Sequence, residues 1–229
     1  RIELHNVRGK RYHAERFKTQ YRVMKVLLAI DIQNDFCPGG QLGVPEGDRI
    51  IPVVNRLSEQ FDHMILTQDW HPADHSSFAS SHAGKEPYET IQMPYGDQVL
   101  WPDHCVQNSD GAAFHPELNT ERAEVIIRKG FRRDVDSYSA FFENDQKTQT
   151  GLAGYLRERG FTDIYVCGLA TDFCVRWSVI DGRNEGFHMH VVEDGVKGID
   201  LDGSVDQAWR EMKEVGAEVI RSGDIDLHG

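Results

Sequence analysis

Short apolar runs of strand length recur along this chain, and helix-forming stretches separate most of them. The first run, residues 23–30 (VMKVLLAI), is apolar at nearly every position. A strand that is apolar on both faces belongs in a parallel sheet covered by helices, because a half-exposed sheet would show alternation. Parallel neighbours also need long crossover connections, which the helical stretches supply. The pattern predicts an α/β fold with an open, mostly parallel sheet and helices on both faces.

The same pattern sets the expected elements. We predict six strands, at residues 23–30, 63–67, 123–128, 163–167, 188–192 and 217–220. We predict helices at residues 49–60, 151–159, 173–185 and 204–215. Residues 70–120 have no sustained period and are rich in Pro, Gly, Ser and His, which is typical of a long functional loop. No repeat or linker divides the chain, so residues 23–229 are predicted to form a single domain.

Residues 1–22 differ in composition from the rest of the chain. They contain seven Lys or Arg and two Glu, and their apolar positions follow no period. Met24 directly precedes the body of the first predicted strand. Residues 1–22 are therefore interpreted as a basic N-terminal extension or leader that lies outside the domain.

Composition excludes several classes of function. The 229 residues carry a formal net charge of −12, with 25 Lys or Arg against 37 Asp or Glu. An acidic chain without a long basic run in its body is a poor partner for nucleic acid or an anionic membrane. The chain has neither an apolar run of membrane-spanning length nor a signal-peptide core, so a cytoplasmic location is expected. Its four cysteines are widely spaced without a CxxC pair and are expected to be free thiols.

Polar residues follow four of the predicted strands at the point where each strand ends: Asp31, Asp69, Lys129 and the turn that leads to Cys174. In open α/β sheets, ligands bind at the carboxyl ends of the strands. Cys174 lies in the first turn of a predicted helix, where unpaired backbone N–H groups and a partial positive charge favour a thiolate and lower the cysteine pKa. The same amides can bind the oxyanion that forms when a thiolate attacks a carbonyl.

Asp31, Lys129 and Cys174 together suit nucleophilic catalysis. A cysteine nucleophile needs a group that accepts its proton and a cation that holds the thiolate. Asp31 can accept the proton and deliver it later, and Lys129 can stabilise the charges. A carboxylate can replace the usual imidazole base if burial raises its pKa toward neutrality. Taken singly, Asp31 could instead cap a turn, Lys129 could be a solvated charge, and Cys174 could be a small packing residue.

Histidines gather around one aspartate in the long loop. Asp69 and His71 are two residues apart in an extended segment and therefore face the same side. With His104 they offer one carboxylate and two imidazoles, which suit a divalent metal that keeps positions open for water or substrate. His75 is a further candidate ligand or a partner that positions a ligand. The alternative is that these histidines serve only the core or the surface.

Six segments of the chain combine these residues in a specific order and spacing. They are AIDIQNDFCPGG (29–40), TQDWHP (67–72), LWPDHCV (100–106), RKG (128–130), DSYSAFF (136–142) and GLATDFCV (168–175). The segments resemble the nicotinamidase/pyrazinamidase branch of the isochorismatase-like cysteine hydrolases. The resemblance runs from about residue 24 to the C-terminus, excludes the leader, and implies a three-layer α/β/α fold.

The resemblance implies a catalytic role for four residues. Cys174 is the expected nucleophile, Asp31 the proton shuttle and Lys129 the third member of the triad. The Leu169–Ala170 peptide is expected to be cis, and the amides of Ala170 and Cys174 are expected to form the oxyanion hole.

The resemblance also implies how substrate and metal are held. Asp69, His71 and His104 are expected to bind one divalent metal ion, zinc in the first place, with iron or manganese as alternatives. Three aromatic residues are expected to form the walls of the ring pocket: Phe36, Trp101 and Tyr138. Without the resemblance, packing in the core would explain each of them equally well.

The implied activity is hydrolysis of nicotinamide to nicotinate and ammonia in NAD salvage, with pyrazinamide as a further substrate. Self-association into a homo-oligomer is expected because relatives often associate. The main alternative is an amidase for another small amide or carbamoyl compound, although such relatives generally lack the metal trio. A two-histidine, one-carboxylate iron oxygenase would need a β-rich barrel and leaves Cys174 and Lys129 unexplained. A catalytically silent binding module is disfavoured because all three triad positions are present.

Overall fold

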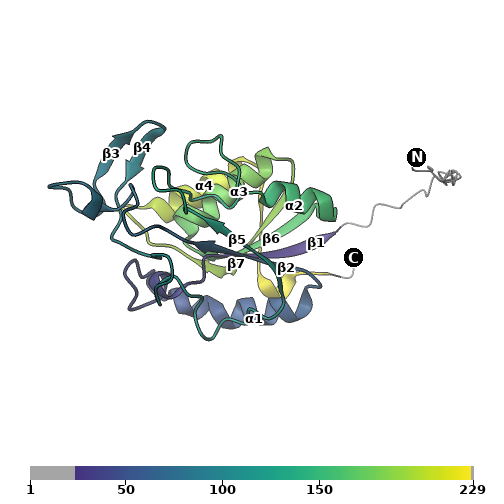
Figure 1. The fold of residues 1–229 in the computed structure, drawn as a ribbon. Coiled ribbons are helices and arrows are strands. Elements are labelled where there is room, and N and C mark those ends of the chain that lie inside the picture. Colours follow the sequence, from purple (N-terminus) through teal and green to yellow (C-terminus); the bar gives the residue numbers. More distant parts are fainter. Residues whose placement is uncertain (1–23, 228–229) are drawn as a thin grey trace, which may run out of the picture.

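The computed structural model of the chain describes residues 24–227, so the predicted leader lies outside the described residues. Six strands form one sheet in the order β5-β2-β1-β6-β7-β8, and every neighbouring pair is parallel (Figure 1). The strands are β1 (Lys25–Ile30), β2 (Met64–Asp69), β5 (Ala123–Lys129), β6 (Asp163–Leu169), β7 (His188–Lys197) and β8 (Glu218–Ile220). The predicted six-stranded parallel sheet is confirmed.

Helices cover both faces of this sheet. Helix α1 (Ile51–Gln60) lies on one face, and α2 (Leu152–Arg159), α3 (Arg176–Asn184) and α4 (Ser204–Glu214) lie on the other (Figure 1). The three-layer arrangement is therefore the expected one. None of the helices within residues 24–227 is long and apolar enough to cross a membrane.

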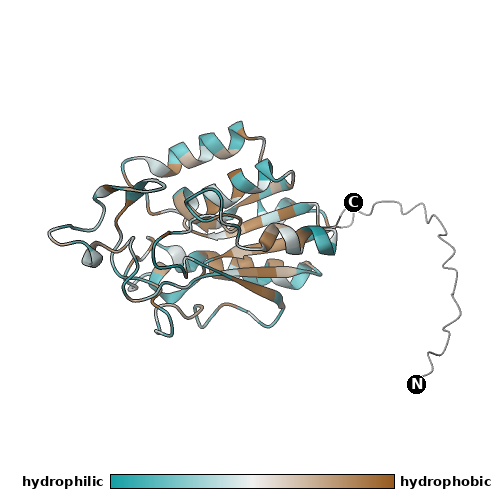
Figure 2. Ribbon diagram, turned by 45° about the horizontal axis from the view of Figure 1, so that its top comes forward, coloured by the Kyte–Doolittle hydropathy of each residue, from teal (hydrophilic) through white to brown (hydrophobic). Residues whose placement is uncertain are grey.

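The central strand β1 explains why its sequence is apolar at consecutive positions. Val26, Leu28 and Ile30 are fully buried in the cluster that includes α2, α3 and α4. Leu27 and Ala29 are at most 1% exposed and belong to the cluster on the α1 side. Burial of such a side chain stabilises the fold by about 1.5–3 kcal/mol, so both faces of β1 contribute to stability. Figure 2 shows hydrophobic residues concentrated in the central strands between the helix layers.

The long loop contains a hairpin that the sequence did not reveal. Strands β3 (Thr90–Met93) and β4 (Gly96–Val99) pair antiparallel and project from one end of the domain (Figure 1). Each strand has only four residues, too few for a clear alternation of apolar and polar positions. Strand β7 also runs further than predicted, to Lys197 rather than residue 192.

The sheet brings the predicted polar residues to one edge. Asp69 and Lys129, the last residues of β2 and β5, are paired in register. Ile30 at the end of β1 pairs with Gly168 near the end of β6. Asp31 follows Ile30 directly, so the carboxyl ends of four neighbouring strands supply the site.

Candidate active site

Lys129 is the centre of the catalytic group. The side chain is fully buried, and its Nζ donates hydrogen bonds to Asp69 Oδ1 at 2.6 Å, to the Ser137 carbonyl at 2.8 Å and to Cys174 Sγ at 3.4 Å. The same nitrogen forms an ion pair with Asp31 Oδ2 at 2.8 Å. Burial alone would lower the pKa of Lys129, but Asp31 and Asp69 raise it well above its usual value. Lys129 is therefore a fixed cation that contacts both other members of the predicted triad.

Asp31 is arranged as a base. Its Oδ1 accepts a hydrogen bond from Thr67 Oγ1 at 2.6 Å. Its buried Oδ2 accepts no hydrogen bond from the described residues beyond the ion pair with Lys129, which leaves it open to a proton. Burial raises the pKa of Asp31, and Lys129 opposes the shift. A carboxylate with a raised pKa is a better proton acceptor than an exposed one.

Cys174 lies before helix α3 and not in its first turn. It lies in a π-helical turn, Thr171–Val175, and α3 begins at Arg176. Burial raises the pKa of the thiol well above its usual value; Lys129 opposes the rise, and Asp31 adds to it. The expectation that the helix N-terminus lowers this pKa is wrong for the ligand-free site, because desolvation outweighs the helix charge. The resting group is a thiol, and a base has to remove its proton.

The turn that carries Cys174 is anchored from the far side. The Leu169–Ala170 peptide at its start is cis, which confirms the prediction. The buried Asp172 carboxylate accepts hydrogen bonds from the amides of Ile199 and Asp200 and from Ser204 Oγ, at 2.5–3.0 Å. Ala170 and Cys174 line the same pocket. A substrate oxygen placed between them would therefore lie against the backbone of a turn that is held in position.

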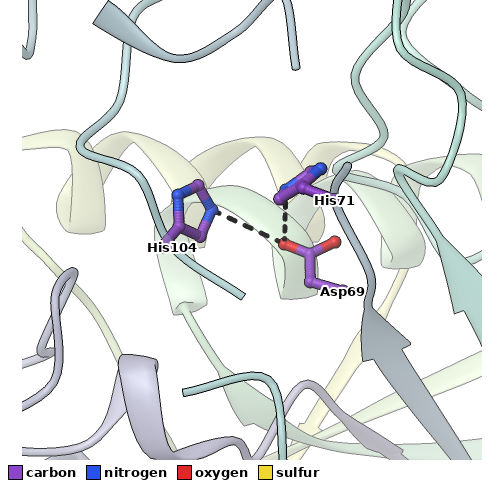
Figure 3. A group of neighbouring side chains, drawn as sticks. All are labelled: Asp69, His71 and His104. Atoms are coloured by element: carbon purple, nitrogen blue, oxygen red, sulfur yellow. Dashed lines mark ion pairs between the residues drawn. The ribbon is translucent and has the colours of Figure 1, made fainter. Parts of the chain in front are cut away.

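The predicted metal ligands converge on one oxygen atom. His71 Nε2 and His104 Nε2 lie 3.4 Å and 3.8 Å from Asp69 Oδ2 (Figure 3). His71 Nδ1 donates to the Gly130 carbonyl at 2.8 Å, and His104 Nδ1 donates to the Pro102 carbonyl at 2.7 Å. Because a carbonyl can only accept, both Nδ1 atoms carry a proton, so Nε2 is the atom of each ring that can bind a metal ion when the ring is otherwise unprotonated.

These donor atoms fit a divalent metal ion. Among residues 24–227, the buried His71 Nε2 has no hydrogen-bond partner, and a cation between the donors would give it one. Donor atoms of Asp69, His71 and His104 all lie within 4.8 Å of one another. Burial and His71 lower the pKa of His104 to about 4, and Lys129 and His71 hold the pKa of Asp69 below its usual range against the effect of burial. The ligands Asp69 and His104 therefore need to release no proton at neutral pH.

Two neighbours fix the orientation of His71. Gly130 has a φ of +63°, and a Cβ there would lie 2.4 Å from His71 Cε1, so only glycine leaves room for the ring. The ring of His75 packs against that of His71 with centroids 4.4 Å apart. His75 Nδ1 accepts from the Ser77 amide at 3.2 Å, and Nε2 lies 3.2 Å from the Val135 carbonyl, to which it donates. Both ring nitrogens of His75 thus have protein partners, and His75 supports His71 from the side.

A pocket joins the two groups. It is small and partly open to solvent. All three predicted aromatic residues contribute to its wall, together with Asp69, His104, Ala170 and Cys174. The aromatic residues are Phe36, Trp101 and Tyr138. Trp101 Nε1 donates to the Tyr138 hydroxyl at 3.0 Å, which fixes these two rings relative to each other.

The sequence did not indicate a role in the site for several residues that the structure places there. Phe173 lines the pocket and meets Trp101 edge to face at 4.8 Å. The Gln33 side chain bonds both backbone groups of Asp69, at 2.8 and 2.9 Å, and so ties β2 to the loop after β1. Asp136 is a buried carboxylate in the pocket wall. All three lie within the six segments quoted above, but their contacts depend on side-chain direction, which the sequence does not show.

Comparison with known proteins agrees with this geometry. The profile of the Isochorismatase domain matches residues 25–224. The chain belongs to the isochorismatase family. Within that family, it is 53% identical over 199 residues to a nicotinamidase of Acinetobacter baylyi, a match that covers 87% of this chain and 93% of the relative. It is 43% identical over 205 residues to the nicotinamidase of Escherichia coli, covering 87% and 96% of the two chains.

Solved structures of this isochorismatase family share the fold. An Acinetobacter baumanii nicotinamidase pyrazinamidase superimposes with a TM-score of 0.87 at 53% identity, covering 89% of this chain and 98% of the other. PnC1 from L. infantum in complex with nicotinate gives a TM-score of 0.77 at 38% identity, covering 88% and 94%. The pyrazinamidase of Pyrococcus horikoshii in complex with zinc gives 0.71 at 37% identity, covering 86% and 99%.

Proposed function

We propose that this protein is a nicotinamidase, a metal-dependent cysteine hydrolase that converts nicotinamide to nicotinate and ammonia. The observation that carries the proposal is one small aromatic pocket lined both by Cys174 and by the metal-binding candidates Asp69 and His104. A nucleophile alone would fit many amides. A nucleophile beside a metal site and flat aromatic walls fits a carboxamide on a nitrogen-containing ring.

The first step is proton transfer from Cys174 to Asp31. Donor atoms of these two residues lie within 4.8 Å of each other, and Asp31 Oδ2 is open to a proton. Lys129 Nζ, 3.4 Å from Sγ, stabilises the thiolate as it forms. The thiolate then attacks the carboxamide carbon, and the oxygen that gains negative charge is held by the amides of Ala170 and Cys174.

The second half of the reaction uses Asp31 again. The protonated carboxyl gives its proton to the departing nitrogen, so that ammonia leaves and a thioester on Cys174 remains. Asp31 then takes a proton from water, and the hydroxide attacks the thioester carbon. The carbon–sulfur bond breaks, Cys174 recovers its proton from Asp31, and the carboxylic acid formed loses its proton to solvent and leaves as nicotinate. Covalent catalysis thus divides one difficult hydrolysis into two easier steps.

Phe36, Trp101 and Tyr138 bind the pyridine ring by stacking and edge contacts and exclude water from the thioester. Asp69, His71 and His104 would hold a divalent ion, and that ion would supply a Lewis acid for a ring nitrogen of the substrate. We propose zinc, because a carboxylate and two imidazoles suit it and a similar pyrazinamidase is known with zinc. Iron and manganese accept the same donors.

Two further parts of the proposal concern range and location. Pyrazinamide has the same ring size and carboxamide as nicotinamide, so the pocket admits it as a second substrate. A cytoplasmic location is proposed because all four cysteines are buried free thiols, which suits a reducing compartment.

The test is ammonia release from nicotinamide by the purified, metal-loaded protein. The test variant is Cys174→Ala, and the matched control is Cys167→Ala, which removes another buried thiol from β6. We expect rapid release by wild type and by the control, and none by Cys174→Ala, which should still bind nicotinamide. Substantial release by Cys174→Ala would exclude the nucleophile. No release by metal-loaded wild type would point to another small amide.

A further inference from the structure

Asp136 is a buried carboxylate for which the proposed reaction has no use. It is 2% exposed and lies in the pocket wall. Its Oδ1 accepts a hydrogen bond from the Ser137 amide at 2.7 Å, and its Oδ2 accepts one from Gln98 Nε2 at 3.2 Å. No Lys or Arg among residues 24–227 forms an ion pair with it. A buried carboxylate without a cation is costly, so this position calls for an explanation.

The nearest unsatisfied group is His71. Asp136 Oδ1 lies 3.9 Å from His71 Nε2, the fully buried nitrogen that has no hydrogen-bond partner. Nδ1 of His71 donates to the Gly130 carbonyl, so Nε2 is the ring atom that can bind a cation, and carboxylate oxygens of both Asp69 and Asp136 lie near it. An imidazole nitrogen binds zinc at about 2.0–2.1 Å, so an ion on His71 would lie within about 6 Å of the Asp136 oxygen.

The described lysines and arginines do not pair with every carboxylate of the pocket. Lys129 is shared between Asp31 and Asp69. The one ion pair of Asp136 among the described residues is with His71, at 3.9 Å. A divalent ion on the Asp69 side would add positive charge near both Asp69 and Asp136.

Asp136 stands outside the set of three ligands. Donor atoms that lie within 4.8 Å of one another group Asp69 with His71 and His104, whereas Asp136 groups with His71 and His75. We propose that Asp136 is a positioning residue of the metal centre: its negative charge, rather than its hydrogen bonds, retains the divalent ion on His71. The inference rests on the metal centre of the proposed function but not on the identity of the substrate.

The test measures zinc affinity of the metal-stripped, folded protein by competition with a chromophoric chelator. Asp136→Asn keeps the size of the side chain and removes the charge. Asp134→Asn removes a charge two residues earlier, where the side chain is 84% exposed. Gln98→Met removes the hydrogen bond to Asp136 and keeps the carboxylate. We expect zinc affinity to fall about 10–100-fold in Asp136→Asn, the range for residues that support metal ligands, and to stay within about threefold of wild type in both controls.

Each outcome bears on a separate part of the argument. An Asp136→Asn affinity within threefold of wild type overturns the inference, and so does an equal loss in Gln98→Met, which would assign the effect to hydrogen bonding. If the new amide disturbs the fold beside Gln98, Asp136→Ala replaces it with the same expected loss. A metal-free Asp136→Ala protein that cannot fold also overturns the inference, because the carboxylate would then hold the loop. Wild type that binds no zinc rejects the metal centre itself.

Discussion

Replacing Lys129 by methionine should destabilise the protein far more than the loss of one surface charge. The side chain is fully buried, and its nitrogen lies 2.8 Å from Asp31 Oδ2 and 2.6 Å from Asp69 Oδ1. Methionine has a similar length and fills the space with apolar atoms. The substitution therefore leaves two buried carboxylates, at most 3% exposed, without their cation.

Removing one partner of a buried ion pair typically costs about 3–5 kcal/mol, because the remaining charge has lost both water and its partner. With a urea m-value of about 2 kcal/mol/M, the unfolding midpoint should fall by about 1.5–2.5 M. Lys85→Met is the matched control, since Lys85 forms its 2.7 Å ion pair with Glu89 in solvent. Exposed pairs contribute little to stability, so the control should unfold close to wild type.

The dependence on pH gives the stability loss a second signature. Burial already raises the pKa of Asp31 against the opposing effect of Lys129, so Lys129→Met should raise it further. A carboxyl group whose pKa is raised in the folded state makes the protein less stable as pH rises. The variant should therefore recover part of its lost stability when the pH falls from 7 to 5. Wild type gains no such recovery from Asp69, whose pKa Lys129 and His71 hold below its usual range against the effect of burial.

The assay is urea unfolding of metal-stripped wild type, Lys129→Met and Lys85→Met at pH 7 and pH 5. Adding Asp31→Asn to Lys129→Met should restore part of the lost stability, because it removes one stranded charge. Equal midpoints for Lys129→Met and Lys85→Met would contradict the expected cost of the stranded charges, and so would a loss of stability that grows toward acid pH.

Two other predictions concern activity and metal. Asp31 has to be ionised to accept the thiol proton, and burial raises its pKa, so kcat/KM for nicotinamide should fall on acidification at a pH above the ordinary aspartate value of 3.8. A fall in kcat/KM that begins only at or below this value would contradict the role of Asp31. His71→Ala should lose bound metal and raise KM for nicotinamide together, whereas His188→Ala, at an exposed position, should change neither; unchanged metal content by elemental analysis would reject His71 as a ligand.

The sheet was predictable because each of its strands is marked by a short run of apolar residues in the sequence. The run in β1 is apolar at consecutive positions, and the structure places these side chains alternately against the two helix layers. The π-helical turn before α3 was not predictable in the same way. The sequence of Thr171–Val175 suggests the start of a helix, and only the hydrogen bonds that Asp172 accepts from the segment before α4 show how the turn is held.

The site was predictable to the level of residue type and place in the chain. Asp31, Lys129 and Cys174 stand after strand ends, so the topology of a parallel sheet brings them together. The pKa of Cys174 was not predictable, because it depends on burial and on two carboxylates from other strands. The contacts of Gln33 and Asp136 depend on loops far apart in sequence, joined only in the folded chain.

Asp69 physically connects nucleophile activation to metal binding. One oxygen, Oδ1, accepts from Lys129 at 2.6 Å, and the other, Oδ2, faces the Nε2 atoms of His71 and His104. A cation at Oδ2 would weaken the interaction between Asp69 and Lys129. The positive charge of Lys129 would then interact more strongly with Asp31 and with the thiolate that forms on Cys174. Occupation of the metal site should therefore make the thiol easier to ionise even before substrate arrives. This shared carboxylate gives a physical reason why the nucleophile and the metal ligands lie at neighbouring strand ends.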